Sequence, residues 1–285
     1  MKTGFPLPLL AALVMAAAWP SAHADISARA RLDNFGYRLV DLRPRDGMAP
    51  ALRFVRGGDS SASVGLTEGS REEFESRSNG LSNFAPMVLR SDLPGLHAEA
   101  RMGGVFGAGP GRFSAVASGF LRSRAAEDVE RGFGALLQPS FESYGDGLFE
   151  VTPFTRVVFS GVVTTDVRRT VADSASFVQT AQASVHLTYS TQPGWSERRE
   201  YGVELAGGAE RHRRLRQSVS FTFENAGSSV GNGVLGIQVL ATGQVSPGLM
   251  PGALAPVPEP ATLALLLCGL GVVAGAAARG RRRGA

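Results

Sequence analysis

The C-terminal thirty residues limit the fold of this chain most, because they are too apolar to belong to a water-soluble domain. Residues 261–278 carry no charge and follow a proline-rich spacer. As a helix they would extend roughly 27 Å at about 1.5 Å per residue, which spans a thin bilayer core. A basic flank stays on the cytoplasmic side of a membrane, and four arginines follow the apolar run: Arg279, Arg281, Arg282 and Arg283. The sequence therefore predicts one transmembrane helix at 261–278, a basic cytoplasmic tail at 279–283, and everything earlier on the far side.

The N-terminus predicts export. Lys2 supplies a positive charge, an apolar stretch runs from Leu7 to Ala18, and Ala22-His23-Ala24 has the small-residue pattern of a cleavage site. These three parts, in this order, are typical of a secretory signal peptide. We therefore expect the Sec machinery to export the chain and signal peptidase to remove residues 1–24.

The spacer before the apolar run carries a recognisable motif, Val257-Pro258-Glu259-Pro260. Together with the helix and the basic tail, it resembles the PEP-CTERM sorting signal of exported proteins in Gram-negative bacteria. The resemblance implies processing by the membrane enzyme exosortase. It also implies a transient inner-membrane anchor with the preceding domain in the periplasm, then delivery to the surface or medium of an exopolysaccharide-producing cell. The alternative is an ordinary tail anchor.

The two signals leave residues 25–246 as the ectodomain, with a Pro/Gly/Ala linker at 247–256 and the sorting signal at 257–283. Lys2 and the tail arginines are five of the 29 basic residues, so residues 25–260 hold 24 basic and 25 acidic residues, a net charge of −1. A domain without excess positive charge gives no reason to expect a nucleic acid partner. The single cysteine, Cys268, lies in the apolar run, which excludes a disulfide, a catalytic thiol or a zinc–cysteine site from the ectodomain.

The ectodomain alternates apolar and polar residues with the period of two that is typical of half-buried strands. Alternation is regular in 26–32, 184–190 and 218–223, and a turn is expected at Arg43–Gly47, where Pro44 fixes φ and Gly47 accepts a positive φ. Gly57 to Asn83 is rich in Ser, Gly and Glu and is expected to be a long loop. We predict an all-β fold, an antiparallel β-sandwich similar to a jelly roll. Further strands are expected at 35–42, 51–55, 112–121, 155–167, 177–190, 201–205, 217–224 and 234–245.

One basic cluster suggests a ligand. Guanidinium groups bind carboxylates and sulfates with two parallel hydrogen bonds, so the cluster predicts a site for a polyanion such as an acidic exopolysaccharide. Trp195 and Tyr201 nearby could stack on sugar rings. The alternative is a solvated hairpin loop balanced by neighbouring glutamates. The cluster consists of Arg211, Arg213, Arg214 and Arg216.

Two aspartates are calcium candidates. Asp41 and Asp46, with Asp33 nearby, could offer oxygen ligands to Ca²⁺. The alternative is a turn in which the Asp46 carboxylate accepts a hydrogen bond from the local backbone. The histidines that survive processing are scattered, so we expect no transition-metal site and no cofactor.

No segment combines the elements of a catalytic site. Gly227–Gly231 matches G-x-S-x-G, but no histidine follows it, and we expect a loop there. The glycine-rich segment 103–111 lacks the lysine of a phosphate-binding loop. We therefore expect a non-enzymatic surface or matrix protein with an adhesive or structural role. The alternatives are a carbohydrate-binding or carbohydrate-active module that acts on the exopolysaccharide, and a structural subunit that assembles only with itself.

Overall fold

The computed structural model describes residues 23–55, 58–79, 84–108, 112–124, 129–142, 149–170 and 177–247. Ala22–Gly248 forms one compact unit, and a second unit consists of Met1–Ser21 and Leu249–Ala285. The expected signal peptide up to Ala22, the linker after Pro247, the sorting motif, the transmembrane helix and the basic tail all lie outside the described residues. Within the described ranges, the structure has no helix that is long and apolar enough to cross a membrane.

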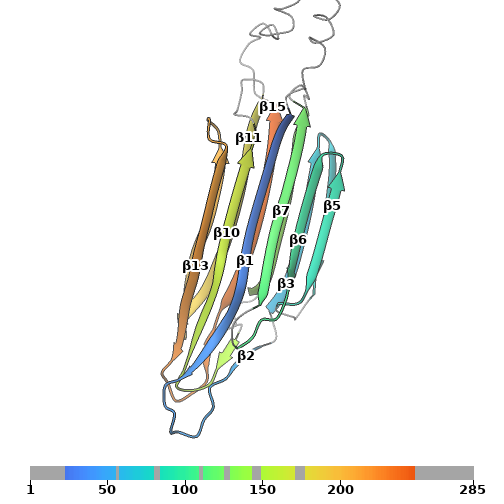
Figure 1. Ribbon diagram of the computed structural model, residues 1–285. Helices are drawn as coiled ribbons and strands as arrows, with labels where there is room; N and C mark the ends of the chain where they lie inside the picture. Colours follow the sequence, from blue (N-terminus) through green and yellow to red (C-terminus); the bar gives the residue numbers. More distant parts are fainter. Residues whose placement is uncertain are drawn as a thin grey trace, which may run out of the picture. The chain divides into compact units, whose positions relative to one another are not determined.

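The described residues form antiparallel strands in two six-stranded sheets and one small sheet (Figure 1). Sheet 1 has the order β13-β10-β1-β7-β6-β5, sheet 2 the order β12-β11-β15-β8-β3-β4, and sheet 3 the order β14-β9-β2. The strands of sheet 1 are β1 (His23–Asp41), β5 (Met87–Leu93), β6 (Leu96–Gly103), β7 (Phe113–Arg124), β10 (Thr155–Arg169) and β13 (His212–Asn225). Those of sheet 2 are β3 (Gly58–Glu68), β4 (Arg71–Ser78), β8 (Arg131–Glu142), β11 (Phe177–Gln192), β12 (Trp195–Ala206) and β15 (Leu235–Pro247). Sheet 3 consists of β2 (Leu52–Phe54), β9 (Phe149–Val151) and β14 (Gly231–Gly233).

Sheets 1 and 2 pack face to face around one apolar core to which both contribute, as in a sandwich (Figure 1). In β1 the side chains of Ile26, Ala28, Ala30 and Leu32 are buried, and the polar residues between them face outward. Val219, Phe221 and Phe223 of β13 are buried in the same alternating way. The prediction of an all-β antiparallel fold is confirmed, while the likeness of the strand order to a jelly roll stays a prediction.

β1 is longer than the sequence suggested. Residues 26–32 and 35–42 were expected as two strands, but His23–Asp41 is one strand with a bulge. The pairing register shifts between Asp33 and Gly36, where Asn34 has a φ of 52°. The turn predicted after it is confirmed: the Asp46 amide donates to the carbonyl of Arg43 at 3.1 Å, and Gly47 has a φ of 77°.

The prediction of a long loop from Gly57 to Asn83 and the alternative of a hairpin loop at the basic cluster are both wrong. The range from Gly57 to Asn83 contains a hairpin of β3 and β4, because its serines, glycines and glutamates occupy solvent-facing positions of strands. Residues 212–216 belong to β13, an edge strand of sheet 1, and not to a hairpin loop. β5, β6, β8, β9 and β14 were not predicted at all.

Buried arginines hold both sheets together at the crossovers between them. Arg169, at the end of β10, donates to the carbonyl oxygens of Glu210 at 2.6 Å and Gly207 at 2.9 Å. Arg131, at the start of β8, donates to the carbonyl oxygens of Arg122 and Pro94, each at 2.7 Å. Buried carbonyl groups need such donors, so these two side chains satisfy carbonyl groups at strand ends and in the connecting turns.

Candidate functional site

The outward face of sheet 1 carries rows of charged residues that the strand register aligns. One row runs across five strands as Arg214, Asp166, Arg29, Ser118 and Glu99. The neighbouring rows are His212, Arg168, Ser27, Phe120 and His97 on one side, and Arg216, Thr164, Arg31, Val116 and Arg101 on the other. Successive rows are about 6.7 Å apart, the distance between residues i and i+2 of a strand.

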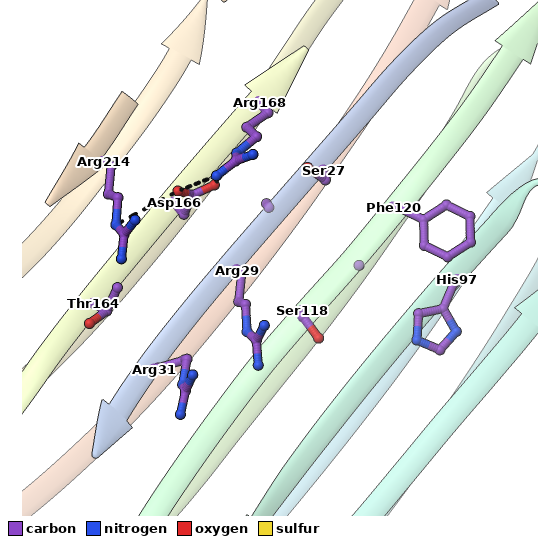
Figure 2. A pocket seen from close by; sticks show the side chains of 12 residues that line it. Ser27, Arg29, Arg31, His97, Ser118, Phe120, Thr164, Asp166, Arg168 and Arg214 are labelled. Carbon is purple, nitrogen blue, oxygen red and sulfur yellow. Dashed lines mark hydrogen bonds and ion pairs between the residues drawn. The ribbon is translucent and has the colours of Figure 1, made fainter. Parts of the chain in front are cut away.

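The middle of these rows is hollowed. An open concavity of ≈ 440 Å³, here called the arginine hollow, is lined by arginines from three strands (Figure 2). Arg29 and Arg31 belong to β1, Arg168 to β10 and Arg214 to β13. A second concavity of ≈ 500 Å³, here called the end hollow, shares Ser27, Phe120 and Arg168 with the first. The two hollows therefore adjoin along β1, and together they are here called the groove.

The acidic residues in the groove do not form ion pairs with all of its arginines. Asp166 accepts a hydrogen bond from Nε of Arg168 at 2.8 Å, and its Oδ2 lies 3.1 Å from Nε2 of His212 and 4.0 Å from Nε of Arg214. Partial burial raises the pKa of Asp166, but the hydrogen bonds from Arg168 and His212 outweigh it, so the pKa lies below its ordinary value. Arg29 is exposed, and no described residue forms an ion pair with it.

An aromatic surface borders the arginines. Phe120 of β7 is 46% exposed, and its ring stacks on the imidazole of His97 with centroids 5.4 Å apart (Figure 2). An exposed aromatic ring beside charged groups can stack on a flat ligand surface. The groove thus combines guanidinium donors, carboxylate and hydroxyl acceptors, and one exposed ring.

The structure brings together only part of the basic cluster predicted from the sequence. Arg214 lines the arginine hollow, Arg211 lines the end hollow, and Arg216 lies in the next row. Arg213 points to the opposite face of its strand, where its Nε donates to Glu210 at 2.7 Å. Trp195 lies at the far end of β12, so it is not part of this site.

Sequence reasoning missed Arg29, Arg31 and Arg168, although one signal was visible. Ser27, Arg29 and Arg31 are the polar positions of the alternating segment that identified β1. These residues lie near Arg168 and Arg214 because β1 pairs with β10 and β10 pairs with β13. The local pattern does not contain these pairings between strands far apart in the sequence.

The calcium candidates are engaged in other contacts. Oδ1 of Asp46 accepts from the amide of Met48, and Oδ1 of Asp41 accepts from the amide of Arg43, each at 2.8 Å. Asp33 accepts from Nη2 of Arg31 at 2.8 Å. In the described part of the chain, no three acidic, histidine or cysteine side chains gather as a metal site would require.

The nearest approach to a catalytic arrangement is on sheet 2. Oγ of Ser184 lies 3.0 Å from Nε2 of His186, and Oε1 of Glu200 lies 3.8 Å from the same nitrogen. In a serine–histidine–acid triad the acid holds the other ring nitrogen, but here Nδ1 of His186 lies 3.4 Å from Nη2 of Arg198. Ser184 is also fully buried. This geometry does not activate a nucleophile.

No curated protein and no solved structure is significantly similar to this chain. One family comparison does match: residues 256–283 fit the PEP-CTERM protein-sorting motif. The matched range contains the Val257–Pro260 motif, the apolar run and the arginine tail. The chain therefore carries a PEP-CTERM protein-sorting motif at its C-terminus, which is consistent with a substrate of exosortase.

Proposed function

We propose that this protein is a non-enzymatic component of the bacterial surface or extracellular matrix that binds acidic exopolysaccharide through the groove of sheet 1. Exosortase would release it from a transient inner-membrane anchor after export into the periplasm. The sorting motif supports export and delivery to the surface. The observation that carries the binding role is the alignment of Arg29, Arg31, Arg168 and Arg214 around one open hollow.

The mixture of groups favours an acidic polysaccharide over other polyanions. The arginines match carboxylate or sulfate groups, while Asp166, Ser27 and Ser118 offer acceptors for sugar hydroxyl groups. Phe120 and His97 offer a flat surface for a sugar ring.

Processing is tested by the intact mass of the protein from membrane, surface and medium fractions of its own cells. We expect a chain that begins at Asp25 and ends near Pro260. A mass that still contains Cys268 and the terminal arginines would contradict exosortase processing and leave an ordinary membrane anchor.

Binding is tested by titrating the purified protein with alginate oligosaccharides, which are uronic acid polymers. Changing Arg29 and Arg214 together to serine should weaken binding about tenfold, the loss expected for two partly solvated charge-assisted hydrogen bonds. The matched control changes Arg45 and Arg77, two exposed arginines outside the groove, and should alter the affinity less than about twofold. Neutral dextran should not bind.

Phe120 gives a second test. Phe120→Ala should weaken alginate binding, whereas Phe74→Ala, at a 73% exposed ring on β4 in the other sheet, should not. Equal losses in each groove variant and its control would contradict binding at the groove. Tighter binding of single-stranded DNA than of alginate would assign the groove to nucleic acid instead.

A further inference from the structure

Asp25, the residue that follows the expected cleavage site, lies in the end hollow. The polar residues around it are mostly basic: Arg122 of β7, Arg168 of β10, Thr170 just after β10, Arg211 just before β13, and His212 at the start of β13. Oδ1 of Asp25 lies 3.4 Å from Nε of Arg122. Asp25 thus occupies one end of the groove along β1.

The backbone of Asp25 is fixed on its β10 side. Its amide nitrogen donates to Oγ1 of Thr170 at 2.9 Å, and its carbonyl oxygen accepts from the amide of Thr170 at 3.0 Å. Ile26 and the residues after it continue the ladder with β10, so the position of Asp25 does not depend on the two residues before it. Those two residues, His23 and Ala24, pair only with β7.

We infer that removal of residues 1–24 completes the anion-binding groove by placing the α-ammonium group of Asp25 in it. The inference rests on the proposed function and on the cleavage predicted from Ala22-His23-Ala24. Hydrolysis of the Ala24–Asp25 bond adds water, so that Ala24 leaves as a carboxylate and the nitrogen of Asp25 becomes an amine that takes up a proton. The pKa of a free α-amino group is about 7.7–8.0, so the amine is mostly charged at neutral pH.

The processed groove would therefore contain one more cation than the unprocessed chain. The carboxylate of Asp25 already faces Arg122, and the new charge adds to Arg168 and Arg211 at the same end of the groove. An acidic polysaccharide that lies along β1 would meet it after passing the arginine hollow. Affinity for the polymer would then depend on the maturation of the chain.

The composition of the chain makes this amine accessible to selective chemistry. Lys2 is the only lysine, and every other basic residue besides histidine is arginine. After cleavage the α-amino group of Asp25 is the sole primary amine, so an acetylating reagent that is specific for amines modifies this position alone.

The test uses full chain expressed in an exporting cell, with the processed protein purified and its first residue verified by mass. Half of the sample is acetylated, and both halves are titrated with alginate oligosaccharides at pH 7. We expect acetylation to weaken binding about three- to fivefold, the effect of one partly exposed charge pair. When the pH is raised from 7 to 9, the affinity of the unmodified protein for alginate should fall by the same factor. The affinity of the acetylated protein should stay constant.

The matched control inserts Gly-Ser between Ala24 and Asp25, so that the free amine lies two residues outside the groove. Acetylation of this variant should leave the affinity unchanged. The inference is overturned by a first residue other than Asp25, by unchanged affinity of the acetylated protein, or by equal losses in the protein and the insertion variant. If the Arg29 and Arg214 substitutions weaken alginate binding but acetylation does not, the inference fails and the proposed function stands. If alginate does not bind at all, both fail.

Discussion

The buried guanidinium of Arg131 donates to the carboxylate of Glu68, with Nη2 and Oε1 2.6 Å apart. The side chain of Arg131 is only 7% exposed, whereas that of Glu68 is 34% exposed. The same guanidinium also satisfies the carbonyl oxygens of Arg122 and Pro94. It therefore ties the start of β8 to the end of β7 and to the β5–β6 turn.

Loss of this arginine should destabilise the domain. Arg131→Met leaves two carbonyl groups and a carboxylate without their donor, and we expect the free energy of unfolding to fall by about 3 kcal/mol. Glu68→Gln keeps the arginine and its carbonyl partners, and should cost about 1 kcal/mol. Urea unfolding of both variants measures the difference, and equal effects would contradict a role that extends beyond the ion pair.

Gly119 in β7 and Gly134 in β8 should respond differently to substitution by alanine. A Cβ at Gly119 would overlap the ring of Phe133, while a Cβ at Gly134 would meet nothing within 4 Å. Gly119→Ala should therefore cost about 1–3 kcal/mol, the range for overpacking a core. Gly134→Ala should be neutral or slightly stabilising, because it lowers the entropy of the unfolded chain. Thermal unfolding of the two variants gives the comparison.

The Asp166→Asn variant should show whether the groove only binds polysaccharide or also cleaves it. In a purely binding groove, Asp166→Asn removes a negative charge beside Arg168, Arg214 and His212. We expect tighter binding of densely charged polymers such as heparin, by about threefold, with a smaller gain for alginate. A variant that loses a measurable polysaccharide-cleaving activity would instead favour the carbohydrate-active alternative.

His186 should make stability depend on pH. Burial lowers the pKa of His186, and Arg198 lowers it further, against the opposing effect of Glu200. Well above pH 6.5 the ring is neutral in both folded and unfolded chains and contributes no pH dependence. As the pH falls below 6.5, the unfolded chain takes up the proton first, so stability decreases until the folded-state pKa is passed.

The measurement compares urea unfolding of the wild type and His186→Gln at pH 7 and pH 5. We expect the wild type to lose more stability than the variant between these two values. The other histidines are present in both proteins and cancel in the comparison. A larger loss in His186→Gln would mean that burial does not dominate the environment of this ring.

The sequence predicted the strands whose buried and exposed residues alternate without interruption. Ser218–Phe223 and Ser184–Ser190 have this pattern, and both lie in strands of the structure. β3 and β4 were missed because their outward positions are filled by small or acidic residues of the kind found in loops. In β8 the small residues Gly132 and Gly134 occupy outward positions of a continuous strand and hide its alternation.

Only part of the groove could be predicted from the sequence, and the reason differs from the one that hid β3, β4 and β8. The polar side of β1 was visible in the alternation, and the arginines near residue 214 were visible as a cluster. The polar side of β1 and these arginines lie close together because Arg29 pairs with Asp166 and Asp166 pairs with Arg214. Pairing over such separations is set by the whole sheet and not by local periodicity.

Strand β1 begins and strand β15 ends at the same end of the sandwich (Figure 1). The two expected cleavage sites, after Ala24 and near Pro260, therefore lie on segments that join the domain at a single pole. Trimming both would leave the edge strands and the opposite pole with its Gly47 turn unchanged. A polymer bound along β1 would therefore have one end beside the pole from which both trimmed segments leave.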